Sequence, residues 1–449
     1  MEATAGRRSN VFRTAGALVS AVALLAAFAT VSGASTNPNT GYPKGNLTAA
    51  QIKLAASYTG GVANKTAKGT PVKVGFINDD NGLVAYPENT AGANLGVWLV
   101  NKYLDGVKGH PIQLDRCQGN DDTSVAACAV QMVDDHVKVV LTGTIINNNS
   151  QMYKTLFTAH IPVIIGNGLT TPDFAPPAKP TPGTGVTYMP GSPGVILGMA
   201  KFLGTNGLGS KPKSIAVVYT SDAGAVTAYN FLFKTDKYLK GIPIKGVEIS
   251  DTATASQVES AINASGAKKA SVFVPLVPVQ GCISVYDALK TLRINPKVVT
   301  TGLCFGTPLI AHLHGTFPNG WYFGDYGVNY FIYKSSLQAS VQLAVYIAAV
   351  HQDNPTMQYT GFAGPSFGNV LTVTRFYNAL GTAASSAKIA SLAKSFKGPQ
   401  WGIPGPLHCG FDITEPAVCG QTMGIAQFKS GKWIPIEDAY NNKLIDGFK

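Results

Sequence analysis

Charge is scarce in this sequence. Charged residues make up 13% of the 449 residues, whereas hydrophobic residues make up 45%. This composition excludes intrinsic disorder over most of the chain, because it supplies ample apolar material for a core. The formal net charge is +11, but the sequence has no dense basic run interleaved with aromatic residues. It therefore does not indicate a nucleic-acid-binding protein.

Sequence patterns that indicate catalysis or metal binding are also scarce. The stretch 204–211, "GTNGLGSK", resembles a phosphate-binding loop, but its lysine is displaced and no strand leads into it. No H-E-x-x-H pattern and no C-x-x-C spacing occurs, and of the seven histidines only His312 and His314 are close together. We therefore predict a protein that is not an enzyme and that holds no cofactor and no metal.

The first 34 residues differ from the rest of the chain. Three arginines are followed by an uncharged run, Thr14 to Gly33, and by small residues up to Ala34. This order is typical of a secretory signal peptide cut after Ala34, and an uncleaved membrane anchor is the alternative. The segment's three arginines and one glutamate contribute +2 of the formal charge of +11, which leaves +9. We predict an exported protein that is periplasmic, cell-envelope-associated or extracellular.

Export makes the six cysteines informative. An even number of cysteines in an exported protein favours disulfides, and these six fall into three pairs that are close in sequence. Free buried thiols are the alternative. The predicted pairs are Cys117–Cys128, Cys282–Cys304 and Cys409–Cys419.

Strand and helix patterns alternate from residue 72 onwards. The apolar strand pattern Val72–Ile77 precedes helical spacing over Asn89–Leu104, and similar units follow with short connections. A Pro- and Gly-rich stretch, residues 171–194, separates this series from a second one of the same style. The pattern predicts an α/β protein with two Rossmann-like lobes, parallel central sheets and a ligand cleft at the carboxyl ends of the strands.

The predicted organisation has four parts. Residues 1–34 form the signal peptide and residues 35–70 an N-terminal tether with one short helix. Residues 71–189 and 325–385 form lobe 1. Residues 190–324 and 386–449 form lobe 2.

Five stretches carry a family resemblance: "VKVGFINDDNGLVAYPENTAGANLGVWLVN", "GHPIQLDRCQGNDDTSVAACAVQMVDDHVKVVLTG", "NNNSQ", "IPVIIGNGLTTPDF" and "KSIAVVYTSDAGAVTAYNFL". In their order and spacing, over roughly Val72 to Phe428, the chain resembles the type I periplasmic solute-binding proteins of ABC importers, in the leucine/isoleucine/valine-receptor branch. The resemblance implies two lobes joined by three crossings, ligand binding between them, hinge closure and recognition of the closed form by a membrane permease.

The resemblance also implies ligand-binding positions in lobe 1. The first loop after the strand at Val72 would line the entrance. The asparagine run would replace a Ser/Thr run that binds the ligand's carboxylate, with Asn149 and Ser150 inward. Backbone N–H groups and a hydroxyl at residues 168–170 would complete an anion cradle. The predicted residues are Asn81, Tyr86, Asn148, Asn149, Ser150, Gly168, Leu169 and Thr170.

Lobe 2 departs from the amino-acid receptors that the chain resembles. Ala223 stands where they usually have a tyrosine, and Leu303 lies in the loop where they carry an acidic residue for the ligand's ammonium. Asp222 is read mainly as a helix cap. The remaining predicted positions are Pro278 and Val279. A buried ammonium without a carboxylate is costly, so we predict a ligand other than a standard amino acid, such as a carboxylic acid with an apolar body.

The functional prediction is therefore a monomeric receptor that captures a small organic ligand and delivers it to an ABC-type importer. A ligand-binding sensor of the same fold, not coupled to transport, is the alternative, because fold alone does not separate the two.

Overall fold

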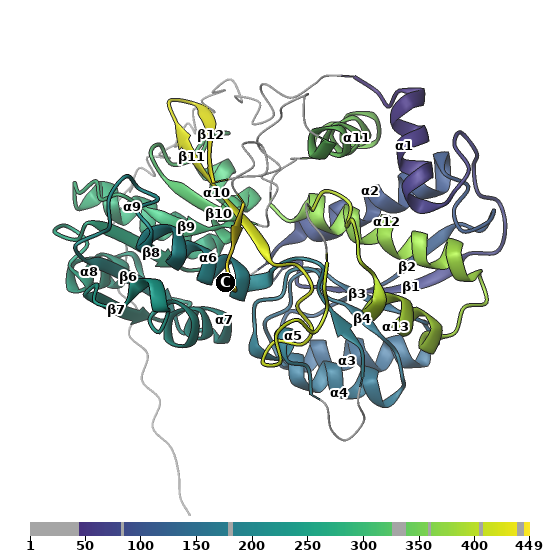
Figure 1. Cartoon of the computed structure of the whole chain (residues 1–449), viewed down its shortest axis with the longest axis horizontal. Coiled ribbons are helices and arrows are strands. Elements are labelled where there is room, and N and C mark those ends of the chain that lie inside the picture. The colour runs from purple at the N-terminus through teal and green to yellow at the C-terminus, as the bar shows by residue number, and fades with distance from the viewer. Residues whose placement is uncertain are drawn as a thin grey trace, which may run out of the picture. The chain divides into compact units, whose positions relative to one another are not determined.

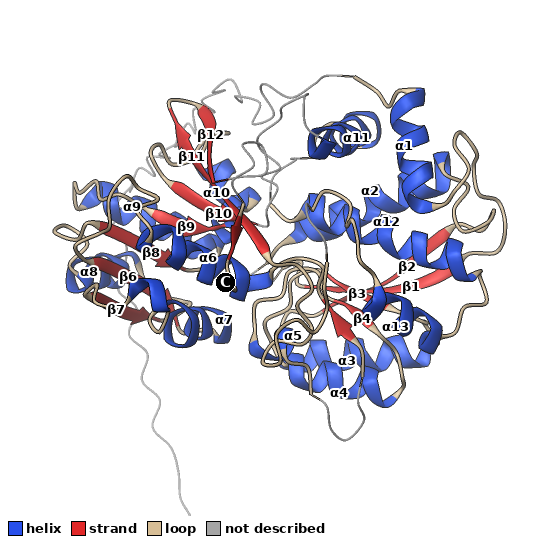
Figure 2. Ribbon diagram, viewed as in Figure 1, coloured by secondary structure: helices blue, strands red, loops and turns tan. Residues whose placement is uncertain are grey.

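We analysed a computed structural model of the chain. It describes residues 45–81, 85–177, 183–325, 338–357, 361–403, 407–437 and 444–449. Strands and helices alternate along much of the chain, and the sheets are flanked by helices (Figures 1 and 2). The predicted α/β class is confirmed.

The first sheet has the order β2-β1-β3-β4-β5, and all of its pairs are parallel. Side chains of β1 alternate between two cores: Val74 and Phe76 belong to one cluster, and Ile77 belongs to the other. Successive side chains of a strand point to opposite faces, and both faces of this strand are buried, so the strand is apolar on both. The strands are β1 (Val72–Asn78), β2 (Ile112–Gln118), β3 (Val140–Thr142), β4 (Val163–Ile164) and β5 (Gly185–Val186).

Helices cover both faces of this sheet. Contacts join α2 to α12, α3 to α4 and α1 to α12. The helices are α1 (Ala49–Thr59), α2 (Pro87–Tyr103), α3 (Asp122–Asp134), α4 (Asn149–Thr158), α5 (Thr171–Phe174), α11 (Gln338–Asp353), α12 (Ala363–Leu380) and α13 (Ser386–Ser395).

The second group of strands begins with the parallel set β7-β6-β8 and continues beside it with β9-β10-β11-β12. A parallel bridge from Phe273 to Val298 links the two sets. β10 is parallel to β9 but antiparallel to β11, which forms a hairpin with β12. The strands are β6 (Ile215–Thr220), β7 (Ile244–Ile249), β8 (Val272–Leu276), β9 (Val299–Thr301), β10 (Tyr322–Asp325), β11 (Thr422–Lys429), β12 (Lys432–Glu437) and β13 (Ile445–Asp446).

These strands share one large apolar core with their helices. The helices are α6 (Gly191–Gly204), α7 (Ala223–Thr227), the π-helical turn η1 (Ala228–Phe233), the 3₁₀ turn η2 (Lys237–Leu239), α8 (Ala255–Ser265), α9 (Val279–Thr291), the 3₁₀ turn η3 (Gly302–Phe305) and α10 (Thr307–His312).

Two segments near the predicted domain boundaries pack onto the helices of the first sheet. The short helix predicted in the tether is confirmed as α1, which contacts α11 and α12, and the Tyr58 hydroxyl lies 2.7 Å from the Thr372 hydroxyl. The predicted lobe boundary after residue 385 falls between α12 and α13, which pack together, with the Phe376 and Phe396 rings 5.2 Å apart. Buried apolar contacts, rather than a change of composition, hold both segments on the first sheet's helices. The remaining division into lobes stays a prediction.

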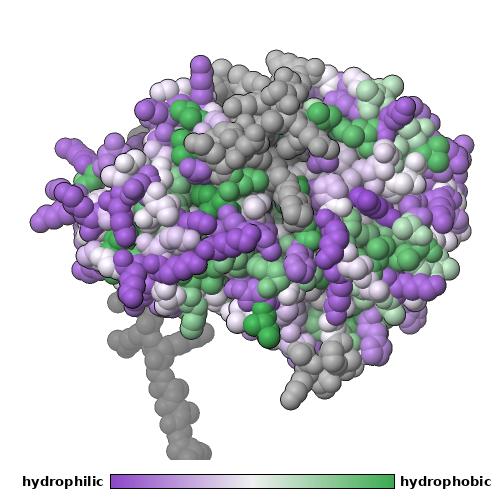
Figure 3. Space-filling view, viewed as in Figure 1, coloured by the Kyte–Doolittle hydropathy of each residue, from purple (hydrophilic) through white to green (hydrophobic). Residues whose placement is uncertain are grey.

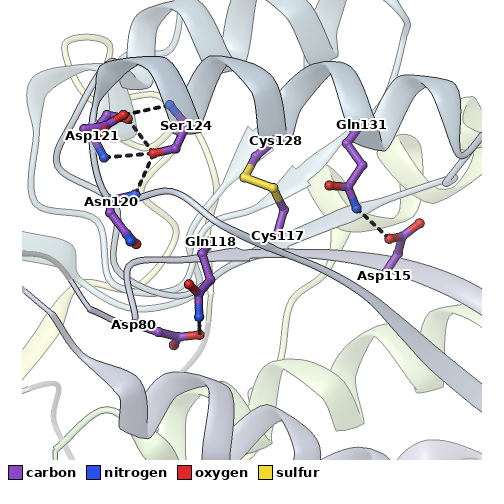
Figure 4. The surroundings of a disulfide bond; sticks show 9 residues. All are labelled: Asp80, Asp115, Cys117, Gln118, Asn120, Asp121, Ser124, Cys128 and Gln131. Carbon is purple, nitrogen blue, oxygen red and sulfur yellow. Dashed lines mark hydrogen bonds between the residues drawn. A yellow bond between two sulfur atoms is a disulfide. The ribbon is translucent and has the colours of Figure 1, made fainter.

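All six cysteines are paired as predicted. The Cys117–Cys128 bond joins the end of β2 to α3, whose first turn is capped by Asp121 accepting from the Ser124 N–H at 2.8 Å (Figure 4). The Cys282–Cys304 bond joins the first turn of α9 to η3.

The visible surface of the described residues mixes hydrophilic side chains with hydrophobic ones (Figure 3). Among the described large apolar residues, Phe231 and Ile413 are the most exposed, at 71% and 94%. None of the described helices combines the length and apolarity needed to cross a membrane.

The Cys282–Cys304 bond yields a stability prediction. Replacing both cysteines by serine should lower the free energy of unfolding by about 3 kcal/mol, because the bond restricts the unfolded chain. Denaturant unfolding measures the change, and the Cys117→Ser, Cys128→Ser pair is the matched control for a bond far from η3. An unchanged unfolding midpoint in the first pair would contradict the prediction.

Candidate functional site

An apolar pocket lies at the carboxyl ends of β8, β9 and β10, where Leu276, Thr301 and Asp325 end these strands. Helix starts that follow strands in the second group supply further lining residues. Ligand sites of open α/β sheets occupy this position, because loops meet at the carboxyl ends of parallel strands. The large apolar side chains of the lining are Ile146, Leu169, Val195, Ile196, Leu276, Val277, Leu303 and Phe362.

The polar side chains of the pocket are acidic or neutral. They are Ser192, Asp222, Thr301 and Asp325, and no lysine, arginine or histidine lies among the described lining residues. The Thr301 hydroxyl accepts from the Leu303 N–H at 3.3 Å. The pocket is therefore an apolar space with carboxylates at its edge.

Asp222 is held in place by neighbouring donors. One of its oxygens accepts from the Thr220 hydroxyl at 2.6 Å and the other from the Ala225 N–H at 2.9 Å. Asp222 is thus the N-cap of α7, as predicted from the sequence, and it also lines the pocket. Its own N–H donates to Asp251 at 3.2 Å, and burial, followed by the Asp222 charge, raises the pKa of Asp251.

Four of the predicted ligand-binding residues line this pocket: Leu169, Asp222, Pro278 and Leu303. Ala223 is exposed, and Val279 is buried at the start of α9; neither lines the pocket. The structure therefore brings three of the five predicted lobe 2 positions together, Asp222, Pro278 and Leu303.

The predicted anion cradle binds a side chain of this chain instead. The buried Asp173 carboxylate accepts from the Leu169 N–H at 3.0 Å, and from the N–H and hydroxyl of Thr170 at 2.9 and 3.0 Å. Its other oxygen accepts from Asn149 at 2.8 Å and from the Tyr153 hydroxyl at 2.6 Å. Burial raises the pKa of Asp173, and these donors oppose the shift. The donors of Leu169, Thr170 and Asn149, which were predicted for a ligand's carboxylate, are therefore already occupied.

The asparagine run behaves differently from the prediction. Asn149 points inward, but toward Asp173, and Ser150 is exposed on α4. Asn148 adopts a left-handed conformation, with φ of 48°, and donates to the Asp122 carbonyl at 2.9 Å. The residue of this loop that lines the pocket is Ile146.

The two predicted residues of the first loop, Asn81 and Tyr86, lie outside the described pocket lining. Asn81 is exposed and donates to the Gln118 side chain at 2.9 Å, and Gln118 in turn donates to Asp80 at 3.3 Å (Figure 4). Tyr86 is fully buried and packs edge-on against Phe362, which does line the pocket. The Tyr86 hydroxyl makes no hydrogen bond of good geometry. Burial, with the charges of Glu88 and Asp222, raises its pKa well above the usual range.

Glu88 is a buried carboxyl in the first turn of α2. Neither of its oxygens makes a hydrogen bond of good geometry. Burial raises its pKa to about 7, opposed by nearby backbone N–H groups of Glu88 and Phe362. The side chain packs onto Gly361, where an added Cβ would lie 2.3 Å from Oε1. Burial therefore favours the protonated, uncharged form of the Glu88 carboxyl.

Several lining residues were missed by the sequence reasoning. Ile146 directly precedes the asparagine run, and Thr301 and Asp325 end strands, so their positions were available signals. Phe362 had none, because it reaches the pocket from the loop before α12, far along the chain. The role of Asp173 had a signal, since an acid three residues after Thr170 fits a capping box.

The stretch Gly364–Gly368 matches the G-x-S-x-G pattern of hydrolases. It lies inside α12 rather than at a strand-to-helix turn, and the buried Ser366 hydroxyl lies 2.8 Å from the Asn89 side chain. The context that would expose a nucleophile is therefore missing. Within the described residues, no group of three His, Cys, Asp or Glu side chains is placed to hold a metal ion.

Removal of the Asp173 carboxylate should destabilise the fold. Asp173→Ala leaves the buried Asn149, Tyr153, Leu169 and Thr170 donors without their acceptor, which should cost about 3–5 kcal/mol. Asp173→Asn keeps one acceptor oxygen and should cost about 1–2 kcal/mol. Denaturant unfolding measures both, with Asp134→Ala on the exposed side of α3 as control. Equal stability of Asp173→Ala and the parent protein would refute the assignment.

The raised pKa of Glu88 predicts a pH-dependent stability. Its folded-state pKa of about 7 lies above the ordinary value of 4.5. Its contribution is therefore fully present below pH 4.5 and is lost as the pH rises through about 7, by about 3 kcal/mol in all. Glu88→Gln should remove this loss, so the variant gains stability over the parent protein as pH rises.

Unfolding curves across this pH range test the Glu88 prediction. Glu415→Gln is the control, because burial also raises the pKa of Glu415 to about 7 at a different place. The two effects should add in the double variant. Parallel stability profiles of Glu88→Gln and the parent protein would rule out the proposed protonation.

Comparison with known proteins gives a consistent result for the fold. The sequence pattern of a family described as periplasmic binding protein matches residues 71–359. Curated proteins give no match. Among solved structures, a leucine-binding protein, LivK, from Thermotoga maritima is similar with a TM-score of 0.65 and 13% identity, covering 81% of this chain and 97% of that one.

Two further structures show the same likeness. A benzoate-bound solute-binding protein of an ABC transporter from R. palustris has a TM-score of 0.66 and 13% identity, covering 82% of this chain and 95% of that one. The isoleucine-bound LivJ from Streptococcus pneumoniae has a TM-score of 0.60 and 15% identity, covering 82% of this chain and 98% of that one. The family match spans more than half of the sequence, and the fold agrees with it. The chain belongs to the periplasmic binding proteins and has their type I fold.

Proposed function

We propose that this protein is an exported receptor that captures a small organic ligand with an apolar body and delivers it to an ABC-type importer. The observation that carries the proposal is the apolar pocket at the carboxyl ends of β8, β9 and β10. Its lining combines large aliphatic side chains with a few fixed polar groups, which is the usual make-up of a small-molecule site.

Family membership supports the receptor role. Solved proteins of this fold are described as binding leucine, isoleucine, benzoate or 4-hydroxybenzoate. These ligands share an apolar body, which matches the lining by Leu169, Leu303 and Phe362. Because identity to these proteins is at most 15%, the individual ligand does not transfer to this chain.

A standard amino acid remains a poor candidate, but for a different reason from the one predicted. The sequence reasoning expected no acid for the ligand's ammonium, whereas Asp222 and Asp325 line the pocket. The obstacle is instead the amino acid's carboxylate, because the Leu169 and Thr170 N–H groups predicted to bind it already donate to Asp173. The predicted carboxylic acid meets the same obstacle at Leu169 and Thr170.

The proposed mechanism is a population shift. A ligand that contacts both the Leu169 loop and the loops after β8 and β9 favours the arrangement in which these segments enclose it. A permease then recognises that arrangement. The protein acts as a monomer and needs no cofactor in this scheme.

Ligand capture is testable without knowing the ligand. Native mass spectrometry of protein purified without denaturation should detect a bound small molecule. Leu303→Ala should weaken calorimetric binding of the recovered compound about tenfold, through lost apolar contact. Leu313→Ala, which alters a partly buried residue outside the pocket lining, is the control. Chemical turnover of the compound would refute the receptor role.

Delivery to an importer needs a separate test. Cellular uptake of the labelled ligand should be lost when the permease gene is deleted. Small-angle scattering should show a smaller radius of gyration with ligand. Unchanged uptake together with an altered transcriptional response would favour the sensor alternative.

A further inference from the structure

We propose that the pocket selects ligands whose polar group is a hydrogen-bond donor, an amine or a hydroxyl, on an apolar body, and that it rejects ligands carrying a free carboxylate. This inference rests on the proposed function and specifies its ligand class. It follows from where donors and acceptors lie around the pocket, and Asp173 and Asp222 are its two determining residues.

Asp173 occupies donors of Leu169 and Thr170 that were predicted to bind a ligand's carboxylate. The Leu169 and Thr170 N–H groups and the Thr170 hydroxyl all reach one oxygen of Asp173, at 2.9 to 3.0 Å. Thr170 is 2% exposed and Asp173 is equally buried. A ligand carboxylate at this place would have to displace a buried side chain of the protein. Asp173 therefore supplies, within the chain, the carboxylate that the cradle would otherwise take from a ligand.

Asp222 supplies acceptors at the pocket wall. Its two oxygens accept from the uncharged Thr220 hydroxyl and Ala225 N–H, and no ion pair to Asp222 is found among the described residues. A carboxylate has about four acceptor positions, so Asp222 retains capacity for a ligand donor. Its attachment at the start of α7 fixes its direction before the ligand arrives.

The charged side chains that line the pocket among the described residues are acidic. Asp251 lies against Asp222, whose N–H donates to it at 3.2 Å. The charge of Asp222 also reaches Tyr86, whose buried hydroxyl makes no hydrogen bond of good geometry. The lining includes Asp222 and Asp325 and, among the described residues, no cationic side chain. This local excess of acid stands out in a chain with a formal net charge of +11.

Together these effects favour the binding of a ligand with a hydrogen-bond donor over the binding of a carboxylic acid. A ligand carboxylate beside Asp222 would meet a like charge in a poorly solvated pocket, and such juxtapositions are strongly unfavourable. An ammonium there gains an opposite charge, and a hydroxyl gains an acceptor without a charge penalty. Discrimination between an amine and its matched acid should therefore reach at least about tenfold in Kd.

Calorimetry with matched probes tests the inference. Each set shares one apolar body and differs in its polar group: benzylamine, benzyl alcohol and benzoate, and then isopentylamine, isopentanol and isovalerate. The full mature chain is used, after removal of carried ligand. The amine or alcohol of a set should bind at least about tenfold more tightly than its acid.

Variants connect the selectivity to Asp222. Asp222→Asn keeps a good helix cap but loses the charge, so amine binding should weaken at least about tenfold and acid binding should strengthen. Asp134→Asn, an exposed change in α3, should leave all three affinities unchanged. Thermal unfolding of each variant checks that the fold is intact.

Two results would overturn the inference. One is an acid that binds as tightly as its matched amine and alcohol. The other is the failure of every amine and alcohol to bind at about 1 mM. Tight binding of benzoate would overturn the ligand class while leaving the receptor role standing, whereas the receptor role fails on the mass-spectrometric and turnover results given above.

Discussion

The five hydrogen bonds to the Asp173 carboxylate tie together the segments that form one side of the pocket. They connect the start of α5 with α4 and with the loop after β4. Backbone N–H groups at the ends of parallel strands need acceptors once they are buried. Here the chain provides the acceptor itself, so these loops are ordered before any ligand arrives. The same arrangement decides which ligand groups can bind there.

A second theme is the separation of charge. The chain carries a formal charge of +11 and has mixed polarity on its visible surface, yet its buried and pocket-lining charged groups are mostly acids. Glu88, Asp173 and Asp251 all have raised pKa values, with burial as the largest cause. Acids held in this way make the interior around the pocket receptive to donors and cations. They also make stability fall as pH rises, since deprotonation of a buried acid is unfavourable.

Much of the fold could be predicted from the sequence. The alternation of patterns from Val72 onwards predicted the parallel sheets, and the spacing of the cysteines predicted all three disulfides. The domain bounds stay a prediction, and two segments near them show how packing, not composition, holds a segment in place. Helix α1 sits in a segment that is polar in composition, but Ile52, Ala55 and Ala56 are buried in the core shared with α12. Helix α13 is likewise held by packing, because the ring of Phe396 at its end contacts the rings of Tyr188 and Phe376.

For the candidate site, too, some features could be predicted from the sequence and others only from the tertiary structure. The family resemblance pointed to Leu169, Asp222, Pro278 and Leu303, and these residues line the pocket because parallel strands deliver the residues after them to one edge of a sheet. The direction of each side chain came only from tertiary structure. Asn149 and Thr170 turn to Asp173, Ser150 turns to solvent, and Phe362 enters from a distant loop. A sequence records which donors exist, whereas the folded chain decides which of them are already used. Hydrogen bonds between residues far apart along the chain form only after the sheets and helices have packed.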